Sequence, residues 1–204
     1  DLALKLTQEP VTDRYGFVWT QQAALRALFT YDPAAWWYLI EQVATNRYFH
    51  ITVIDLIIAE LDAGQPRIGA EQGYRVLQTC IATENDYNVS KALTYLLTHE
   101  WPGRVDYVLS LLPHRSKQMR RLVRNEVVTW LVRQGEQDAA IFDRIAPYAT
   151  HKSAAARLAA IEMLGRIDAA RARAVFAPLV KAEQSHKARQ AMLDLLIGAS
   201  ALTE

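Results

Sequence analysis

The chain has 204 residues, of which 51% are hydrophobic and 22% charged, and this composition is typical of an ordered protein rather than a disordered one. Its apolar runs are interrupted by acidic residues and are too short to span a bilayer, and no secretory signal pattern opens it. The net charge of +1 combines 7 basic and 12 acidic residues in 1–100 with 16 basic and 10 acidic residues in 101–204. This asymmetry indicates either two faces or ends with different partners or two halves of an array that differ in ancestry.

The single cysteine, Cys80, excludes an intramolecular disulfide framework and favours a reducing compartment, so we expect a cytoplasmic protein. The first residue is Asp1 rather than Met, which is consistent with a processed chain or a fragment of a larger one.

The first clear helix signal is "YDPAAWWYLIEQVA", which starts at Tyr31. Asp32 is a good N-cap residue, and Pro33 suits the first helical position because its missing N–H has no partner there in any case. One apolar stripe follows at helical spacing, formed by Trp36, Leu39, Ile40 and Val43.

The next segment, "HITVIDLIIAEL", is rich in β-branched residues and is the one ambiguous place in the chain. Its apolar residues Ile51, Ile54, Ile58 and Leu61 fall at helical spacing, which predicts a helix. Similar patterns predict helices over about 66–83, 87–99, 104–112, 117–133, 137–149, 153–167, 170–182 and 186–198. The breaks are short, so neighbouring helices should form antiparallel hairpins.

From residue 87 onward the predicted helices repeat in pairs, whose first members begin near 87, 117, 153 and 185, a period of roughly 32 residues. "HKSAAARLAAIEMLGRI" (151–167) returns as "SHKARQAMLDLLIGA" (185–199), with Arg157 matching Arg189. This period is typical of an α-solenoid, in which stacked helix pairs cover one another's apolar faces. The repeated arginine is either a ligand-binding residue or, as we expect, a structural one that bonds or stacks across the joint between repeats.

The stretch "AAARLAAIEMLGRI" resembles the first helix of a HEAT repeat of the short bacterial kind, with matches at Arg157, Ala160, Leu164 and Gly165. The next copy matches more loosely, through Arg189, Leu196 and Gly198. Serine stands where that family usually has a capping aspartate, at Ser153 and Ser185, and serine caps equally well.

The resemblance is clearest over 116–199 and implies an all-α, HEAT-like solenoid of stacked helical hairpins. We expect residues 1–204 to form a single structural unit, with a divergent helical part over 1–86 and recognisable helix pairs over 87–199. Such a scaffold implies no single function.

The strongest local motif is "HRSKQMRRLVRNE", which contains no acidic residue between 114 and 125. On a helix it forms a basic stripe at i, i+3, i+4 and i+7, made of Lys117, Arg120, Arg121 and Arg124. This stripe is a candidate surface for nucleic-acid phosphates, an acidic partner protein or an anionic lipid head group. The alternative is an ordinary solvated helix face, partly paired with acidic residues of neighbouring repeats.

Trp37 shares a helix face with Glu41, and this pair resembles the tryptophan and acid with which HEAT-like alkylpurine DNA glycosylases hold a base. The alternative is simple aromatic packing between helices. The five histidines have no metal-ligand spacing, and no nucleotide-binding or hydrolase motif is present, so we expect no metal, no cofactor and no enzyme activity.

The sequence therefore predicts a non-catalytic scaffold or adaptor module that binds a protein, or another domain of a parent chain, in a solenoid groove. The alternatives are nucleic-acid binding through the basic helix face and a HEAT-like alkylpurine DNA glycosylase that uses Trp37 and Glu41, and no membrane partner is expected.

Overall fold

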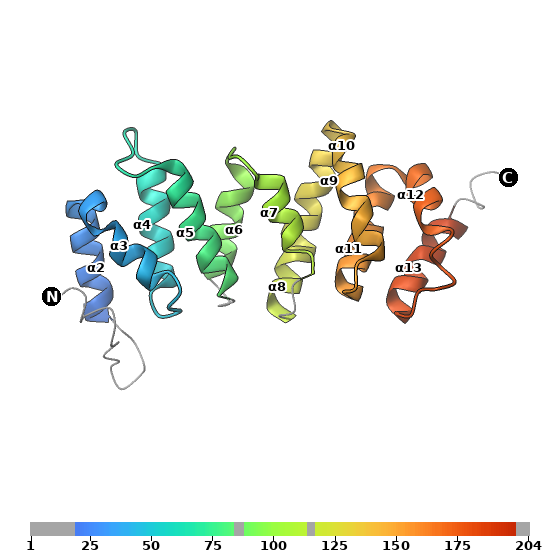
Figure 1. Ribbon diagram of the computed structural model, residues 1–204, viewed down its shortest axis with the longest axis horizontal. Helices are drawn as coiled ribbons and strands as arrows, with labels where there is room; N and C mark the ends of the chain where they lie inside the picture. The colour runs from blue at the N-terminus through green and yellow to red at the C-terminus, as the bar shows by residue number, and fades with distance from the viewer. Residues whose placement is uncertain (1–18, 84–87, 114–116, 199–204) are drawn as a thin grey trace. The chain divides into compact units, whose positions relative to one another are not determined.

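The computed structural model describes residues 19–83, 88–113 and 117–198, and every regular element in these ranges is helical (Figure 1). The chain divides into two compact units, unit 1 at Asp1–Trp101 and unit 2 at Pro102–Glu204. The all-α fold class expected from the sequence is thus confirmed, while the single unit over 1–204 stays a prediction. Within the described ranges, none of the helices has both the length and the apolar character needed to cross a membrane.

Unit 1 contains five described helices that pack on their neighbours in the chain and on the next helix but one. α4 lies at the centre of this unit, where it contacts α2, α3, α5 and α6. The bounds are α2 Trp19–Tyr31, α3 Pro33–Val43, α4 His50–Leu61, α5 Ala70–Ala82 and α6 Asn88–Thr98.

The two helices predicted at the start of the chain are confirmed. The carboxylate of Asp32 accepts the backbone N–H of Ala35 at 3.1 Å, and Pro33 is the first residue of α3. α4 is helical despite its β-branched residues, because Val53, Ile54, Leu56 and Ile57 fill the interior of unit 1. Of the predicted stripe only Ile54 is fully buried, and Ile51 is 45% exposed. The helix expected over 66–83 begins later, at Ala70, after a loop that contains Pro66.

Unit 2 is built around α11 (Ala154–Ile167), which contacts α9, α10, α12, α13 and the 3₁₀ helix η2. Its side chains Ala156, Ala160, Met163 and Leu164 are fully or almost fully buried. The other bounds are α7 Arg104–Ser110, α8 Lys117–Leu122, η1 Val123–Val127, α9 Val128–Gln137, α10 Ala140–Ile145, η2 Ala146–Thr150, α12 Ala169–Phe176 and α13 His186–Ile197.

The helices predicted over 137–149 and 170–182 are both shorter α-helices than the sequence indicates. In each case the α-helix ends just before an Ala-Pro pair, so that α10 gives way to the 3₁₀ helix η2 at Pro147 and α12 ends at Phe176 before Pro178. Proline lacks the N–H that the α-helix needs and disfavours the α conformation of the residue before it. The same break therefore recurs 31 positions apart.

The helix predicted over 117–133 is helical throughout but changes type in the middle. Residues Val123–Val127 form the π-helix η1 between α8 and α9. Wide turns of this kind are rare, and they occur frequently at functional sites.

Two glycines allow helices to approach closely, one in each unit. A Cβ added at Gly135 in α9 would lie 2.4 Å from the Cδ1 atom of Ile167, and one added at Gly73 in α5 would lie 2.9 Å from a Cδ atom of Leu61. Both glycines are buried, so the absence of a side chain sets the spacing of the helices.

Candidate functional site

Unit 2 has a groove of about 760 Å³ between the basic segment α8–η1 on one side and α11 on the other. Residues at the start of α13 also line it. The lining residues are Leu112, Arg121, Arg124, Asn125, Ala154, Ala155, Leu158, Ala159, Glu162, Ser185 and Lys187. Three successive first helices of the predicted hairpins thus contribute to one concave surface.

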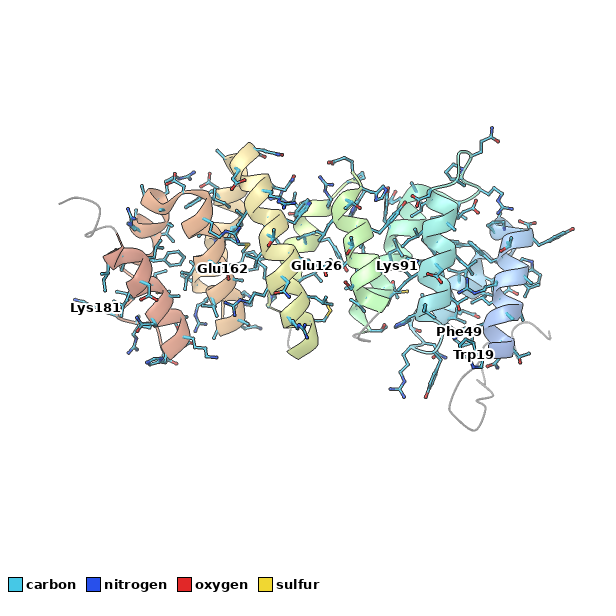
Figure 2. The ribbon with its side chains drawn as sticks, turned by 180° about the vertical axis from the view of Figure 1, so that it is seen from behind. Trp19, Phe49, Lys91, Glu126, Glu162 and Lys181 are labelled. Carbon is cyan, nitrogen blue, oxygen red and sulfur yellow. The ribbon has the colours of Figure 1, made fainter. Side chains whose placement is uncertain are left out.

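The basic wall of the groove contains two residues of the predicted stripe, Arg121 and Arg124, and both are exposed. The side chains of Lys117 and Arg120 lie outside the described part of the structure. The Nε atom of Arg124 lies 3.7 Å from a carboxylate oxygen of Glu162, which projects from α11 (Figure 2). Arg124 therefore makes one contact of the kind that the alternative interpretation of the stripe, an ordinary helix face partly paired with neighbouring repeats, predicts.

That ion pair covers only a small part of Arg124, because the arginine side chain remains 70% exposed to solvent. Exposed pairs of this kind contribute little to stability, so a ligand carboxylate can compete for the guanidinium group at small cost. Glu162 also lies 3.9 Å from the guanidinium group of Arg166, so this carboxylate has a second positive charge nearby.

The floor of the groove is the exposed side of α11, where three of the four lining residues before Glu162 are alanines. Ala155 and Ala159 lie four residues apart and therefore form one small-residue strip beside Leu158. Short side chains allow another backbone to approach the helix closely, while Leu158 offers apolar contact.

Ser185 and Lys187, at the start of α13, also belong to the lining of the groove. Ser185 is the N-cap of α13, and its hydroxyl accepts the N–H of Ala188 at 3.4 Å. Lys187 is exposed and adds a third positive charge to the two arginines of the lining. The serine cap expected at Ser153 is wrong in part: this residue has the N-cap backbone conformation, but its hydroxyl makes no capping bond.

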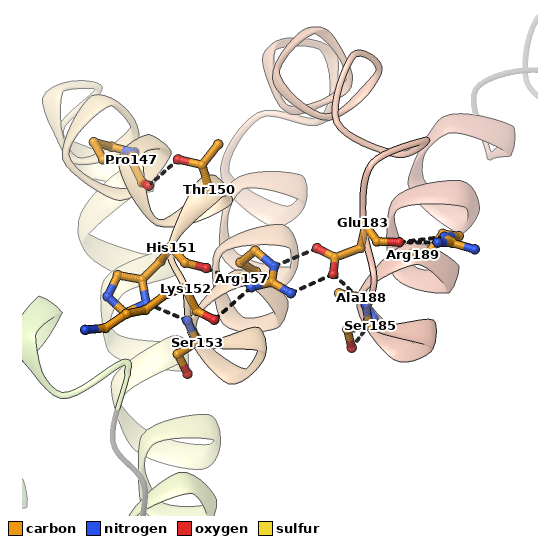
Figure 3. A network of polar contacts seen from close by, with 10 residues as sticks. All are labelled: Pro147, Thr150, His151, Lys152, Ser153, Arg157, Glu183, Ser185, Ala188 and Arg189. Carbon is orange, nitrogen blue, oxygen red and sulfur yellow. Dashed lines mark hydrogen bonds and ion pairs between the residues drawn. The ribbon is translucent and has the colours of Figure 1, made fainter.

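A second polar cluster lies beside the groove, at the joint between α11 and α13 (Figure 3). The guanidinium group of Arg157 holds Glu183 with two hydrogen bonds of 2.6 Å each. It also donates to the backbone oxygens of His151 and Lys152, at 2.8 and 3.2 Å. One arginine thus joins the loop before α11 to the loop before α13, which confirms the structural role predicted for Arg157.

Glu183 is the residue that the sequence analysis missed. Its carboxylate is only 3% exposed and also accepts the N–H of Ser185 at 2.7 Å. The hydrogen bonds from Arg157 hold the pKa of Glu183 below its ordinary value of 4.5, although burial acts in the opposite direction. The carboxylate is therefore charged at neutral pH and serves to hold the joint together.

Trp37 and Glu41, the candidate base-binding pair, lie on α3 in unit 1. Trp37 is half-buried and its ring packs against Phe29 of α2, with 6.4 Å between the ring centroids. Glu41 is exposed on the surface of the same helix. This placement favours the packing interpretation of Trp37.

Two further kinds of site, a metal site and a reactive cysteine, can be checked against the described residues. No group of three or more metal-ligating side chains occurs in residues 19–83, 88–113 and 117–198. Cys80 is buried in unit 1, and desolvation raises the pKa of its thiol to about 12, so it is not a nucleophile at neutral pH.

Comparisons of the chain with protein-family models, with curated proteins and with solved structures give no match. The resemblance to HEAT repeats therefore continues to depend on the residues of this sequence, and the membership in that family stays a prediction.

Proposed function

We propose that the protein is a non-catalytic interaction module of the HEAT-like α-solenoid kind, and that the groove of unit 2 binds an acidic segment of a partner protein or of another domain. One observation carries this proposal: Arg121, Arg124 and Lys187 surround an apolar floor of alanine and leucine in a groove of about 760 Å³. A segment with acidic residues on its flanks and an apolar face fits both features.

The repeat geometry supports the solenoid part of the proposal. Arg157 and Arg189 lie 32 residues apart, and each donates to the backbone oxygen of the residue six positions earlier, His151 and Glu183. Two helices with an N-cap serine in the same backbone conformation and with the same arginine contact are what a repeating hairpin requires.

The charges in the groove favour a protein over a nucleic acid. Glu162 belongs to the lining and is 34% exposed, so a phosphate backbone in the groove would meet a carboxylate. An acidic peptide meets the same Glu162 carboxylate. Its own carboxylates, however, are separated by uncharged residues, whereas the phosphates of a nucleic acid form a continuous row of charges. The alanine floor also offers nothing that discriminates bases.

A direct test compares two polyanions, a fluorescent acidic helical peptide with four Glu-Leu-Ala-Ala repeats and a fluorescent 20-base-pair DNA duplex. Each is titrated with the full chain at several salt concentrations, and the anisotropy gives Kd. The key variant is Arg121→Gln/Arg124→Gln. Its charge-matched control is Arg133→Gln/Lys181→Gln, because both of these residues are exposed in unit 2 and neither lines the groove.

We expect the groove variant to weaken peptide binding by about fivefold to tenfold and the control variant to leave it unchanged, since exposed substitutions usually alter stability by less than about 0.5 kcal/mol. DNA binding should be weak and should vanish near physiological salt. Tight and salt-resistant DNA binding, or a peptide affinity insensitive to the groove variant, contradicts the proposal.

A further inference from the structure

One acidic side chain, Glu162, belongs to the lining of the groove together with its three positive charges. It projects from α11, and Figure 2 marks its position. Its Oε2 atom lies 3.7 Å from the Nε atom of Arg124, on the opposite wall, and its Oε1 atom lies 3.9 Å from a guanidinium nitrogen of Arg166. The two oxygens of one carboxylate thus face two different cations.

Neither cation holds Glu162 with a hydrogen bond, because N–H···O hydrogen bonds span about 2.7–3.2 Å. Unit 1 shows what a firmly held carboxylate looks like. Asp55 of α4 lies between Arg26 and Lys91, at 3.0 and 2.7 Å. The two acidic side chains have similar exposure, 28% for Asp55 and 34% for Glu162, so solvent access does not explain the longer distances. Glu162 is shared by two cations and bound firmly to neither.

The two partners of Glu162 differ in their relation to the groove. Arg124 belongs to the lining, whereas Arg166 does not. Arg166 follows Glu162 by four residues on the same helix, and an acidic residue four positions before a basic one is the favourable order on a helix. The carboxylate therefore has an alternative partner on its own helix, outside the lining.

We propose that Glu162 is a built-in competitor of the groove: it competes with an acidic ligand for Arg124 and turns to Arg166 when such a ligand is bound. This inference rests on the proposed function of the groove. Exposed ion pairs contribute little free energy, so the competition lowers the affinity for acidic ligands without preventing their binding. Arg166 offsets the repulsion between Glu162 and the ligand carboxylate on Arg124.

The same carboxylate sets the selectivity of the groove for acidic peptides over nucleic acids. A DNA duplex carries one negative charge per about 1.7 Å of its axis, whereas acidic residues four positions apart on a peptide helix are separated by about 6 Å. Charges interact over about 8 Å at physiological salt. Glu162 therefore repels several phosphates of a duplex but few carboxylates of a peptide.

The test uses the fluorescent acidic helical peptide and the DNA duplex, each titrated with the full chain and followed by anisotropy. The variants are Glu162→Gln, Arg166→Gln and the double variant. Glutamine has the size of glutamate, and both residues are partly or largely exposed, so the fold should be retained. The charge-matched controls are Glu136→Gln and Arg133→Gln, because both residues are exposed on α9 and neither lines the groove.

We expect Glu162→Gln to strengthen peptide binding about twofold to fivefold, which is the range of an exposed ion pair. The gain for the duplex should be larger, about fivefold or more at low salt, and the slope of log Kd against log salt should steepen by about one, because Arg124 then meets a phosphate. Glu136→Gln should change neither affinity appreciably.

Arg166→Gln tests the exchange of partners. With Glu162 present, it should weaken peptide binding about twofold to threefold, because the displaced carboxylate has lost its second cation. With glutamine at position 162, the same change should have little effect, as Arg133→Gln should have in either background. Circular dichroism of each variant checks that α11 remains helical.

An affinity for the peptide that Glu162→Gln leaves unchanged or weakens overturns the proposal, since Glu162 would then be inert or a ligand contact. A larger gain for the peptide than for the duplex overturns the assigned selectivity. An equal effect of Arg166→Gln in both backgrounds overturns the exchange. The proposed function fails differently, when the groove variant Arg121→Gln/Arg124→Gln leaves peptide binding unchanged. If that variant weakens peptide binding and Glu162→Gln has no effect, the proposed function stands and this inference does not.

Discussion

Glu60 in unit 1 and Glu183 in unit 2 are both buried carboxylates held by an arginine, but the two pairs connect different kinds of segment. Arg67 lies only seven residues after Glu60 and binds it through its backbone N–H, at 2.6 Å, as well as through its side chain. Arg157 and Glu183 are 26 residues apart and join two successive first helices. The same chemistry closes a loop in one unit and fixes the spacing of repeats in the other.

The arginine that closes a loop is also more exposed than the arginine that joins repeats. The Arg67 side chain is 51% exposed, and one of its nitrogens reaches the backbone oxygen of Thr30. The Arg157 side chain is only 17% exposed. An arginine that joins repeats is thus itself part of the packed joint, whereas one that closes a loop remains largely in solvent.

The largest difference between the two pairs should appear when each arginine is replaced by alanine. Arg157→Ala should lower the free energy of unfolding of unit 2 by about 2–3 kcal/mol, because it leaves the Glu183 carboxylate buried without its partner. Arg67→Ala should cost unit 1 about 1 kcal/mol, because solvent can replace an exposed guanidinium group. Hydrogen exchange in urea, read separately from peptides of each unit, measures both values. Equal losses in the two units would contradict the assigned difference.

A smaller effect is expected from filling the close helix contacts. Gly135→Ala places a methyl group 2.4 Å from Ile167 and should destabilise unit 2 by about 1–2 kcal/mol, even after the gain in helix propensity. Gly73→Ala meets the ends of the Leu61 side chain at 2.9 Å, which can shift more easily, so its cost should stay below about 1 kcal/mol. Thermal unfolding followed by circular dichroism ranks the two variants. A larger loss from Gly73→Ala would reverse the order.

The smallest expected difference concerns the response to acid. His50 is fully buried in unit 1, and desolvation lowers its pKa from 6.5, an effect that the hydrogen bond to Ala44 only partly offsets. Since the unfolded chain binds this proton more tightly, unit 1 should lose stability as the pH falls below about 6.5.

The buried pair of unit 2 responds at lower pH. The pKa of Glu183 is held below 4.5, so its contribution is complete above that value and is lost as the pH falls through the lower folded pKa. Hydrogen exchange at pH 7, 5.5 and 4 should therefore show unit 1 weakening first. Replacement of His50 by Gln should remove the early loss, and an unchanged pH profile of that variant would contradict the assignment.

Much of the fold follows from local sequence signals. Asp32 and Pro33 mark the start of α3 through a side-chain cap and a fixed φ angle, both properties of the residues themselves. The shortened α10 and α12 could also have been predicted, because Pro147 and Pro178 are visible in the sequence. α2 carries no cap or proline signal that marks its start, and the sequence analysis did not identify it.

The candidate site was predictable only in part. Arg121 and Arg124 follow from charge spacing, and the structural role of Arg157 follows from its repetition. Glu183 has no local signal, since one glutamate in a polar loop resembles any other, and its importance arises from tertiary contact with Arg157. The repeat register does not reveal this carboxylate either, because the equivalent position of the preceding copy is His151.

The π-helix η1 has a consequence for how this segment varies between related chains. Its i→i+5 hydrogen bonds enclose one residue more per turn than the bonds of an α-helix do. Loss of one residue between Val123 and Val127 would convert the turn to ordinary α-helix and leave the ends of the segment in similar positions. Natural length variation inside this helix is therefore expected to take the form of a single-residue insertion or deletion at 123–127, and such a change would redirect Arg124 and Asn125 while it preserves the buried residues of α9.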